Sequence, residues 1–237
     1  MSNSWFKDWF NTKYYHILYK NRDFQEAENF IEKLSNHLKI QKNSKILDLA
    51  CGKGRHSIFL NKLGYDVTGI DLSKESIDEA KKFKSENLLF TEGDMRKVYK
   101  ENHFDYIFNL FTSFGYFNEM EDNYAVVQSI AKGLKSEGIG VIDFLNAHLV
   151  RKSLPEQKEV LIDGIVFQTN KYEKNEMVHK EILFEEKSKT YTFKESVKLF
   201  ELNHFRAFFE KAGLQLIQVF GSYNPVSYTH LTLPTKA

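Results

Sequence analysis

The chain has 237 residues with 42% hydrophobic content, enough for one large domain or for a domain with an insertion. Its 33 basic and 32 acidic side chains are interspersed and leave a net charge of +1, which argues against a nucleic-acid partner. A single cysteine excludes an internal disulfide, and no apolar run is long enough to span a membrane, so we expect a cytoplasmic protein without a membrane partner.

Residues 1–43 are predicted to form a helical lid ahead of the first strand. The stretch "DFQEAENFIEKLSNHL" has apolar residues on one helical face, which indicates a helix packed on the following domain. The residues before it are rich in aromatic side chains, a composition that suits a cover over a ligand as well as plain packing. These aromatic residues are Trp5, Phe6, Trp9, Phe10, Tyr14, Tyr15 and Tyr19.

Residues 44–150 alternate between strand and helix patterns. The runs "KILDLA", "DVTGIDL", "NLLFTEGD", "FDYIFNLF" and "GIGVIDFL" are predicted strands, and the segments between them have helical periodicity. Gly64 stands where a helix C-terminal glycine belongs, and Ser73 is the predicted N-cap of the next helix. This alternation predicts an α/β fold with a doubly wound, mostly parallel, Rossmann-like sheet.

Residues 151–201 change character, and residues 202–224 return to the α/β pattern. The strand-forming runs are separated by three turn-forming pairs, Asp163-Gly164, Lys174-Asn175 and Lys187-Ser188. These turns predict an antiparallel β-meander inserted after the fifth strand. We expect the meander to lie on the substrate side or at an oligomer contact. We interpret the charges of "EKNEMVHKEILFEEKSK" as solvated hairpin faces. Asn203 is the predicted cap of the last helix, and "LQLIQVFGSY" is the predicted sixth strand.

The stretch "ILDLACGKGRHS" places Gly52 and Gly54 in the turn after the first strand. In an open parallel sheet this turn lies at the ligand-binding edge, where glycine lets the backbone approach a ligand closely. Asp48 precedes Gly52 by four residues, and a carboxylate there suits a ligand that carries an ammonium group better than one that carries a pyrophosphate.

Two further acids follow the next two strands. Asp71 ends the second strand, 17 residues after Gly54, where a carboxylate can accept hydrogen bonds from a ribose diol. Asp94, in "TEGDM" after the third strand, is placed to accept a hydrogen bond from an adenine amine, with Met95 covering the ring. Together the two acids predict a nucleoside-containing ligand.

With these motifs in this order, the sequence resembles the class I S-adenosylmethionine-dependent methyltransferases. "DLACGKG" resembles the glycine motif of that family, "GIDLS" its ribose-binding acid and "GDM" its adenine motif. "YYHILYKNRDFQEA", "ACGKGRHS", "EGDMR" and "LFTSFGYF" are similar to a small-molecule branch that includes deoxyamino-sugar N,N-dimethyltransferases. The resemblance implies S-adenosyl-L-methionine as cofactor and an amine or hydroxyl of a small molecule as methyl acceptor.

The resemblance also implies which residues bind the cofactor. The methionine end would lie over the glycine loop and the end of the fourth strand, and Arg55 or a tyrosine hydroxyl would meet the carboxylate of the cofactor. The predicted cofactor-binding residues are Tyr14, Tyr19, Asp48, Ala50, Cys51, Gly52, Gly54, Arg55, Asp71, Leu72, Asp94, Met95, Asn109 and Leu110.

The resemblance implies chemistry that needs an aligned nucleophile in a desolvated pocket and no metal. The candidates for a catalytic residue are Tyr14 and His204; among the other histidines, His16, His56 and His148 have no metal-ligand spacing. At strand four, "NLFTSF" lacks the prolines of methyltransferases that act on amides or nucleobases, which favours an aliphatic amine or a hydroxyl as acceptor.

Two alternatives remain open, together with the oligomeric state, monomer or homodimer. A nicotinamide-dependent oxidoreductase would need a third glycine where Ser57 stands. The other alternative is a catalytically silent S-adenosylmethionine-binding module that regulates a partner.

The end of the chain, residues 225–237, departs from the family pattern. Residues 226–235 match, residue for residue, one reading frame of a transposase-type sequencing adaptor, so we expect a non-native tail and a longer natural product. The family fold ends in an antiparallel seventh strand beside the fifth. We expect that strand to be missing here or replaced by the tail.

Overall fold

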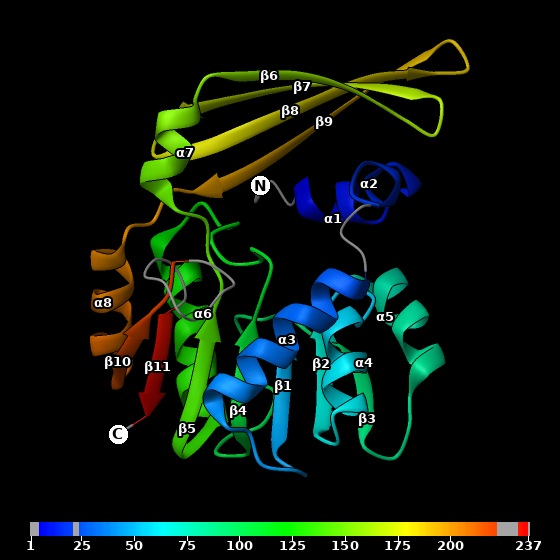
Figure 1. Cartoon of the computed structure of the whole chain (residues 1–237). Coiled ribbons are helices and arrows are strands. Elements are labelled where there is room, and N and C mark those ends of the chain that lie inside the picture. Colours follow the sequence, from blue (N-terminus) through cyan, green and yellow to red (C-terminus); the bar gives the residue numbers. More distant parts are fainter. Residues whose placement is uncertain (1–4, 21–23, 222–231, 237) are drawn as a thin grey trace.

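The computed structural model describes residues 5–20, 24–221 and 232–236, which form two separate sheets (Figure 1). The larger sheet has the strand order β10-β11-β5-β4-β1-β2-β3. Its parallel strands are β1 (Lys45–Leu49), β2 (Asp66–Asp71), β3 (Leu88–Glu92), β4 (Phe104–Asn109) and β5 (Leu134–Ile142). The predicted doubly wound, mostly parallel sheet is therefore confirmed.

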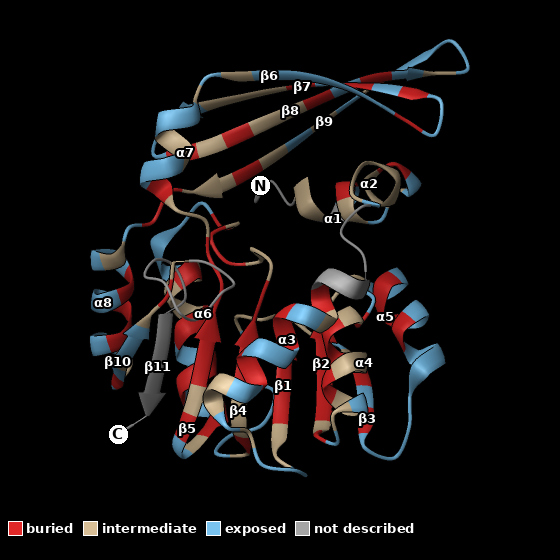
Figure 2. Cartoon of the chain, in the orientation of Figure 1, coloured by how far each residue is buried: buried red, intermediate tan, exposed pale blue. Residues whose placement is uncertain are grey.

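Helices cover both faces of this sheet because its central strands are apolar on both sides. On one face, Ile46 of β1 packs in a core with α3 (Phe24–Leu38), α4 (Arg55–Lys62) and α5 (Lys74–Ala80). On the other face, Leu47 packs with α6 (Met120–Gly133) and α8 (Leu202–Lys211). Figure 2 shows the central strands buried along most of their length. A short 3-10 turn, η1 (Lys81–Phe83), follows α5.

The place of the seventh strand is filled. The strand β11 (Thr232–Lys236) lies between β5 and β10 (Leu214–Val219) and pairs antiparallel with both. It therefore replaces the missing strand with residues of the predicted tail, and the adaptor origin of the tail stays a prediction. Pro234 pairs with Leu216, beside a register shift between Leu216 and Gln218, and such irregularities are where a sheet tolerates proline. Residues 222–231 lie outside the described part.

The predicted meander forms the second sheet, in the order β6-β7-β8-β9. Its strands are β6 (Glu156–Ile162), β7 (Ile165–Lys174), β8 (Met177–Glu186) and β9 (Lys189–Lys198), and α7 (Ala147–Ser153) leads into them. The prediction for the middle turn was wrong by one residue. The turn is Asn175-Glu176, where both residues have positive φ (53° and 57°), because Lys174 still pairs with Met177.

The N-terminal segment divides between the two sheets. The helix α3 packs on the large sheet, whereas α1 (Trp5–Phe10) and α2 (Lys13–Leu18) lie between the small sheet and the carboxyl edge of the large one (Figure 1). Trp9 is fully buried, and its ring centroid lies 4.4 Å from that of Phe193 on β9. None of the helices in the described residues is long and apolar enough to cross a membrane.

One predicted cap was wrong. The N-cap of α8 is Glu201 instead of Asn203, which lies in the first turn. The reason is that the Nδ1 atom of His204 accepts a hydrogen bond of 3.1 Å from the backbone N–H of Glu201, so a histidine takes part in the cap.

We predict that Gly69→Ala lowers the free energy of unfolding by about 1–3 kcal/mol because it overpacks the centre of β2. A Cβ atom at this position would lie 2.7 Å from the Phe90 ring and 2.9 Å from the sulfur of Cys51. The matched control is Gly93→Ala, whose Cβ atom would meet only Ile70, at 3.6 Å. Urea unfolding measures both variants, and equal midpoints would contradict the predicted clash.

Candidate active site

The loop after β1 turns sharply before α4 begins. Ala50, Gly52 and Gly54 have φ values of 65°, 55° and 80°. At Gly54 an added Cβ atom would lie 2.6 Å from the Phe90 ring, so packing also requires glycine there. At Gly52 an added Cβ atom would meet nothing within 4 Å. The loop therefore leaves open space above Gly52, where a ligand can approach the backbone.

Asp71 joins this loop to the loop after β2. One carboxylate oxygen accepts a hydrogen bond of 2.8 Å from the backbone N–H of Gly52, and the other accepts one of 2.8 Å from the N–H of Ser73. Burial raises the pKa of Asp71, and these backbone hydrogen bonds oppose that shift. Ser73 is also the N-cap of α5, as predicted.

Two buried polar residues, Asp48 and Asn109, lie beneath the loop after β1. Asp48 is buried, and the hydroxyl of Ser57 donates a hydrogen bond of 2.5 Å to its carboxylate. Burial raises the pKa of Asp48 to about 6, against the opposing effect of that hydrogen bond. The amide nitrogen of Asn109 donates to the carbonyl of Leu49 at 2.8 Å, while its buried oxygen has no hydrogen-bond partner among the described residues.

A cavity of about 340 Å³, hereafter the first cavity, opens above the loop. His56 also lines it, and its ring stacks on Phe111 at 4.7 Å between centroids, while the Arg55 guanidinium lies 4.5 Å from the same ring. Burial lowers the pKa of His56 to about 3 and also lowers the pKa of His16. The first cavity brings together seven predicted cofactor-binding residues: Tyr19, Ala50, Cys51, Gly52, Arg55, Asp71 and Leu110.

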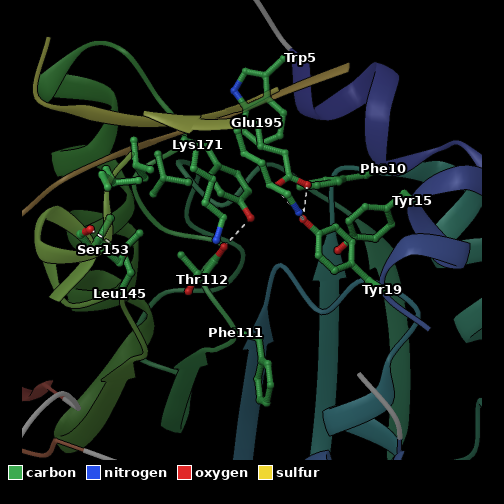
Figure 3. A pocket seen from close by; sticks show the side chains of 16 residues that line it. Trp5, Phe10, Tyr15, Tyr19, Phe111, Thr112, Leu145, Ser153, Lys171 and Glu195 are labelled. Carbon is green, nitrogen blue, oxygen red and sulfur yellow. Dashed lines mark hydrogen bonds between the residues drawn. The ribbon is translucent and has the colours of Figure 1, made fainter. Parts of the chain in front are cut away.

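A second cavity of about 370 Å³ lies between the N-terminal helices, the small sheet and the loop after β4 (Figure 3). We call it the second cavity. Its remaining boundary comes from α7 and the segments beside it, including Leu145 and Ser153. The two cavities share one set of lining residues, which we call the aromatic wall: Phe10, Tyr15, Tyr19, Phe111 and Tyr116.

Charged side chains stand in the second cavity beside this wall. Glu195 accepts hydrogen bonds from the indole N–H of Trp9 at 2.7 Å and from the hydroxyl of Tyr19 at 2.7 and 2.8 Å. Lys180 donates to the same hydroxyl at 2.7 Å. Sequence reasoning did not single out Glu195, and the interpretation of Lys180 as part of a solvated face was wrong. The alternation of Lys180 with Ile182 and Phe184 on β8 was the available signal.

The loop after β4 is strained where it enters the wall. Phe111 and Thr112 both have a φ of 56°, a conformation that bulky and β-branched residues rarely adopt. The backbone N–H of Phe111 donates a hydrogen bond of 3.0 Å to the buried carboxylate of Asp143, just after β5. Strain of this kind is found where a structure positions functional groups. Asp143 is therefore a supporting residue that the sequence motifs did not reveal.

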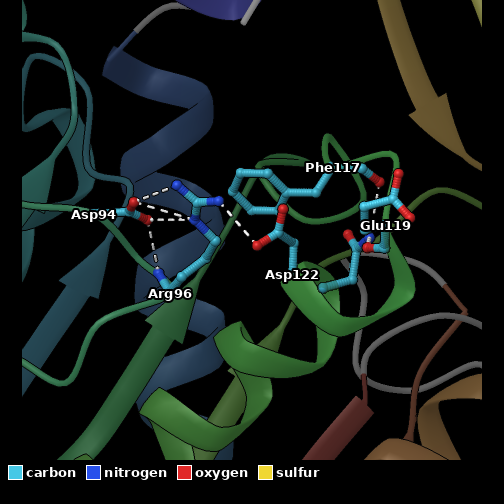
Figure 4. Close-up of polar contacts among 6 residues, drawn as sticks. Asp94, Arg96, Phe117, Glu119 and Asp122 are labelled. Atoms are coloured by element: carbon cyan, nitrogen blue, oxygen red, sulfur yellow. Dashed lines mark hydrogen bonds and ion pairs between the residues drawn. The ribbon is translucent and has the colours of Figure 1, made fainter. Parts of the chain in front are cut away.

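Asp94, predicted to bind adenine, takes part in an ion pair (Figure 4). Arg96 donates to both carboxylate oxygens of Asp94, at distances of 2.6 to 3.1 Å, and donates to Asp122 at 2.9 Å. Although burial opposes it, the hydrogen bonds from Arg96 hold the pKa of Asp94 below its usual value. Neither Asp94 nor Met95 lines either cavity, so the adenine contact stays a prediction.

The structure places both candidates for a catalytic residue away from the cavities. The hydroxyl of Tyr14 donates a hydrogen bond of 2.8 Å to Glu186, and its ring packs against Phe184. His204 belongs to the cap of α8, and His148 is exposed on α7. Leu72 does not line either cavity. Among the residues that the structure describes, no cluster of His, Cys, Asp or Glu side chains could hold a metal ion.

Comparison with known proteins finds a matching family and several similar relatives. A family described as "Methyltransferase domain" matches residues 40–210. A dTDP-3-amino-3,4,6-trideoxy-alpha-D-glucopyranose N,N-dimethyltransferase from Streptomyces venezuelae is 33% identical over 100 residues, which are 42% of this chain and 42% of that protein. The chain spans about half the length, or less, of the first curated relatives that it matches.

Solved structures share the fold over nearly the whole chain. A S-adenosylmethionine-dependent methyltransferase from Clostridium acetobutylicum has a TM-score of 0.77 at 18% identity, covering 94% of this chain and 96% of that one. Streptomyces venezuelae DesVI has a TM-score of 0.72 at 21% identity, covering 94% and 97%. At these identities the likeness concerns the fold alone.

We predict that Asp71→Ala weakens binding of S-adenosylhomocysteine by about 1.5–3 kcal/mol, the range of charge-assisted hydrogen bonds. The substitution removes a carboxylate that lines the first cavity and orients the N–H of Gly52. Titration calorimetry measures the loss. Asp66→Ala, at the opposite end of β2, is the matched control and should bind like the wild type. Unchanged affinity in Asp71→Ala would refute the role of this carboxylate in binding.

A second prediction concerns pH. Burial raises the pKa of Asp48 from 3.8 to about 6, so between these values the folded protein holds a proton that the unfolded chain has lost. The wild type should therefore lose stability relative to Asp48→Asn as the pH rises from about 4 to about 6, by at most about 3 kcal/mol, and the difference should be constant above that.

Thermal melts of the two proteins across this range test the shift of Asp48. Other groups titrate in both proteins, so their contributions cancel in the difference. A difference that does not change with pH would show that Asp48 is not shifted.

Proposed function

Because the chain belongs to the methyltransferase domain family, we propose that it transfers the methyl group of S-adenosylmethionine to an amine of a small molecule. The observation that carries this proposal is the pair of cavities that meet at the aromatic wall. Methyl transfer needs a donor and an acceptor in separate sites that share a boundary, so that the reacting atoms can approach in line.

The residues of the first cavity fit S-adenosylmethionine. Asp71 offers carboxylate oxygens for the ribose hydroxyls, and the open space above Gly52 admits the methionine end. Arg55 lines the same cavity and suits the carboxylate of the amino acid part. Asn109 at the end of β4 does not line this cavity, so its contact with the cosubstrate stays a prediction. When bound, this cosubstrate supplies an electrophilic methyl group on its sulfonium.

The second cavity suits an amine acceptor. The carboxylate of Glu195 can accept a hydrogen bond from an amine N–H and so orient the nitrogen lone pair toward the wall. The transfer would form the new C–N bond from that lone pair and break the S–C bond of the cosubstrate, and the ammonium group so formed would then release a proton to water. Glu195 stands where it can stabilise that ammonium group by charge.

The relatives of higher identity support an amine over a hydroxyl, although a ubiquinone biosynthesis O-methyltransferase from Rickettsia bellii is also 25% identical over 119 residues. The relative from Streptomyces venezuelae is named for dimethylation of an amino sugar, and other structural neighbours are an amino pentose methyltransferase and a sugar N-methyltransferase. The oxidoreductase alternative gains no support, since Ser57 is engaged with Asp48 beneath the loop. The regulatory alternative would leave the charged second cavity without a role.

The test is transfer of a labelled methyl group to a panel of aliphatic amines and amino sugars, each paired with its hydroxyl analogue. We expect label on amines only. Glu195→Gln should lower kcat at least about tenfold and leave S-adenosylhomocysteine binding unchanged, because the lost interaction is on the acceptor side. Glu185→Gln, an exposed residue of β8, is the matched control.

The possible results separate the parts of this proposal. Transfer to hydroxyl analogues alone would overturn the amine assignment. Absence of S-adenosylhomocysteine binding would overturn the proposal as a whole.

A further inference from the structure

One charged row crosses the inner face of the small sheet. In the strand register, Glu156 of β6 pairs with Lys171 of β7, Lys171 pairs with Lys180 of β8, and Lys180 pairs with Glu195 of β9. Residues that pair directly across strands lie on the same face of a sheet. Lys171, Lys180 and Glu195 all line the second cavity, and Figure 3 shows Lys171 and Glu195 among its side chains.

The two lysines in the middle of this row are like charges in direct opposition, an arrangement that destabilises a sheet. The neighbouring row on the same face has a charged side chain only at its outer end, on β6. It consists of Lys158, Thr169, Ile182 and Phe193. Two lysines in direct opposition at a cavity are therefore a local cost to the fold, and a ligand of opposite charge between them would add to the compensation by the flanking Glu156 and Glu195.

The acids of the row stand at its outer positions and do not separate the lysines. Lys171 makes an ion pair with Glu156 at 2.8 Å, and Glu156 also binds Lys158 at 2.6 Å. These two lysines lower the pKa of Glu156 to about 2. On the other side, Glu195 accepts hydrogen bonds from Trp9 and Tyr19, and the ammonium group of Lys180 also lies 4.7 Å from the centre of the Tyr19 ring.

The second cavity thus contains charges of both signs, and Lys180 shares the hydroxyl of Tyr19 with Glu195. The carboxylate of Glu195 stands beside the aromatic wall, where the methyl group would arrive, and Lys171 stands one strand further from it than Lys180. Cβ atoms of directly paired residues lie about 4.5–5.5 Å apart, so two lysine side chains can reach the oxygen atoms of one phosphate or carboxylate group.

We propose that Lys171 and Lys180 form a subsite for an anionic group of the methyl acceptor, so that the acceptor is an amine that also carries a phosphate or a carboxylate. This inference rests on the proposed function. The amine end would lie at Glu195 and the anionic end at the lysine pair, which orients the acceptor along the row and presents its nitrogen to the aromatic wall.

The test is calorimetry on the full chain saturated with S-adenosylhomocysteine, with inorganic pyrophosphate as one probe and malonate as the other. We expect at least one probe to bind, and the stronger probe identifies phosphate or carboxylate as the anionic group. Lys171→Met and Lys180→Met should each weaken that binding about tenfold or more, since each removes a charge-assisted hydrogen bond and keeps an apolar stem.

The controls separate charge from structure. Lys174→Met, exposed on the opposite face of β7, should bind the probe like the wild type. Lys171→Arg should retain binding, and Glu156→Gln should tighten it several-fold because it releases Lys171 from its ion pair.

Absence of binding by both probes would overturn the subsite, as would equal affinity in the wild type and both methionine variants. The proposed function is tested separately, because S-adenosylhomocysteine binding and methyl transfer to uncharged amines depend on the first cavity and on Glu195. Loss of those activities would count against the function, whereas loss of probe binding alone counts against the lysine subsite.

Discussion

The carboxylate of Asp71 connects the two loops on which the rest of the site depends. It accepts a backbone N–H from Gly52 after β1 and another from Ser73 after β2, so the carboxyl ends of two neighbouring strands are held together by one side chain. Burial disfavours its charge, and the two donors favour it. The glycine loop therefore keeps its shape through a group that also faces the first cavity.

The second cavity depends on a different contact, between segments far apart in the chain. Trp9 and Tyr19 lie in the N-terminal segment of the chain, and both donate hydrogen bonds to Glu195 on β9. Tyr19 also lines the first cavity, so a residue that is hydrogen-bonded to the small sheet is part of the aromatic wall between the cavities. The large sheet thus carries the first cavity, while the insertion and the N-terminal helices shape the second cavity, which we propose holds the acceptor.

Much of the fold could be predicted because its signals are local. The periodicity of strands and helices, the cap at Ser73 and the turns of the small sheet depend on residues close in sequence. Asp94 shows the limit of such reasoning. Its position after β3 indicates the correct edge of the sheet, but the motif does not reveal that Arg96 and Asp122 form an ion-pair network around it. That network requires α6 to pack nearby.

By itself, the sequence determined the α/β architecture, the glycine loop and the carboxylate of Asp71 at the ligand-binding edge, because strand ends and turn residues follow from short-range patterns. Only the tertiary structure decided that Lys180 and Glu195 face a cavity, while Tyr14 turns away from it to bind Glu186. The physical reason is that successive side chains of a strand point to opposite faces of the sheet. Which face becomes a binding site depends on the distant helices that pack against it.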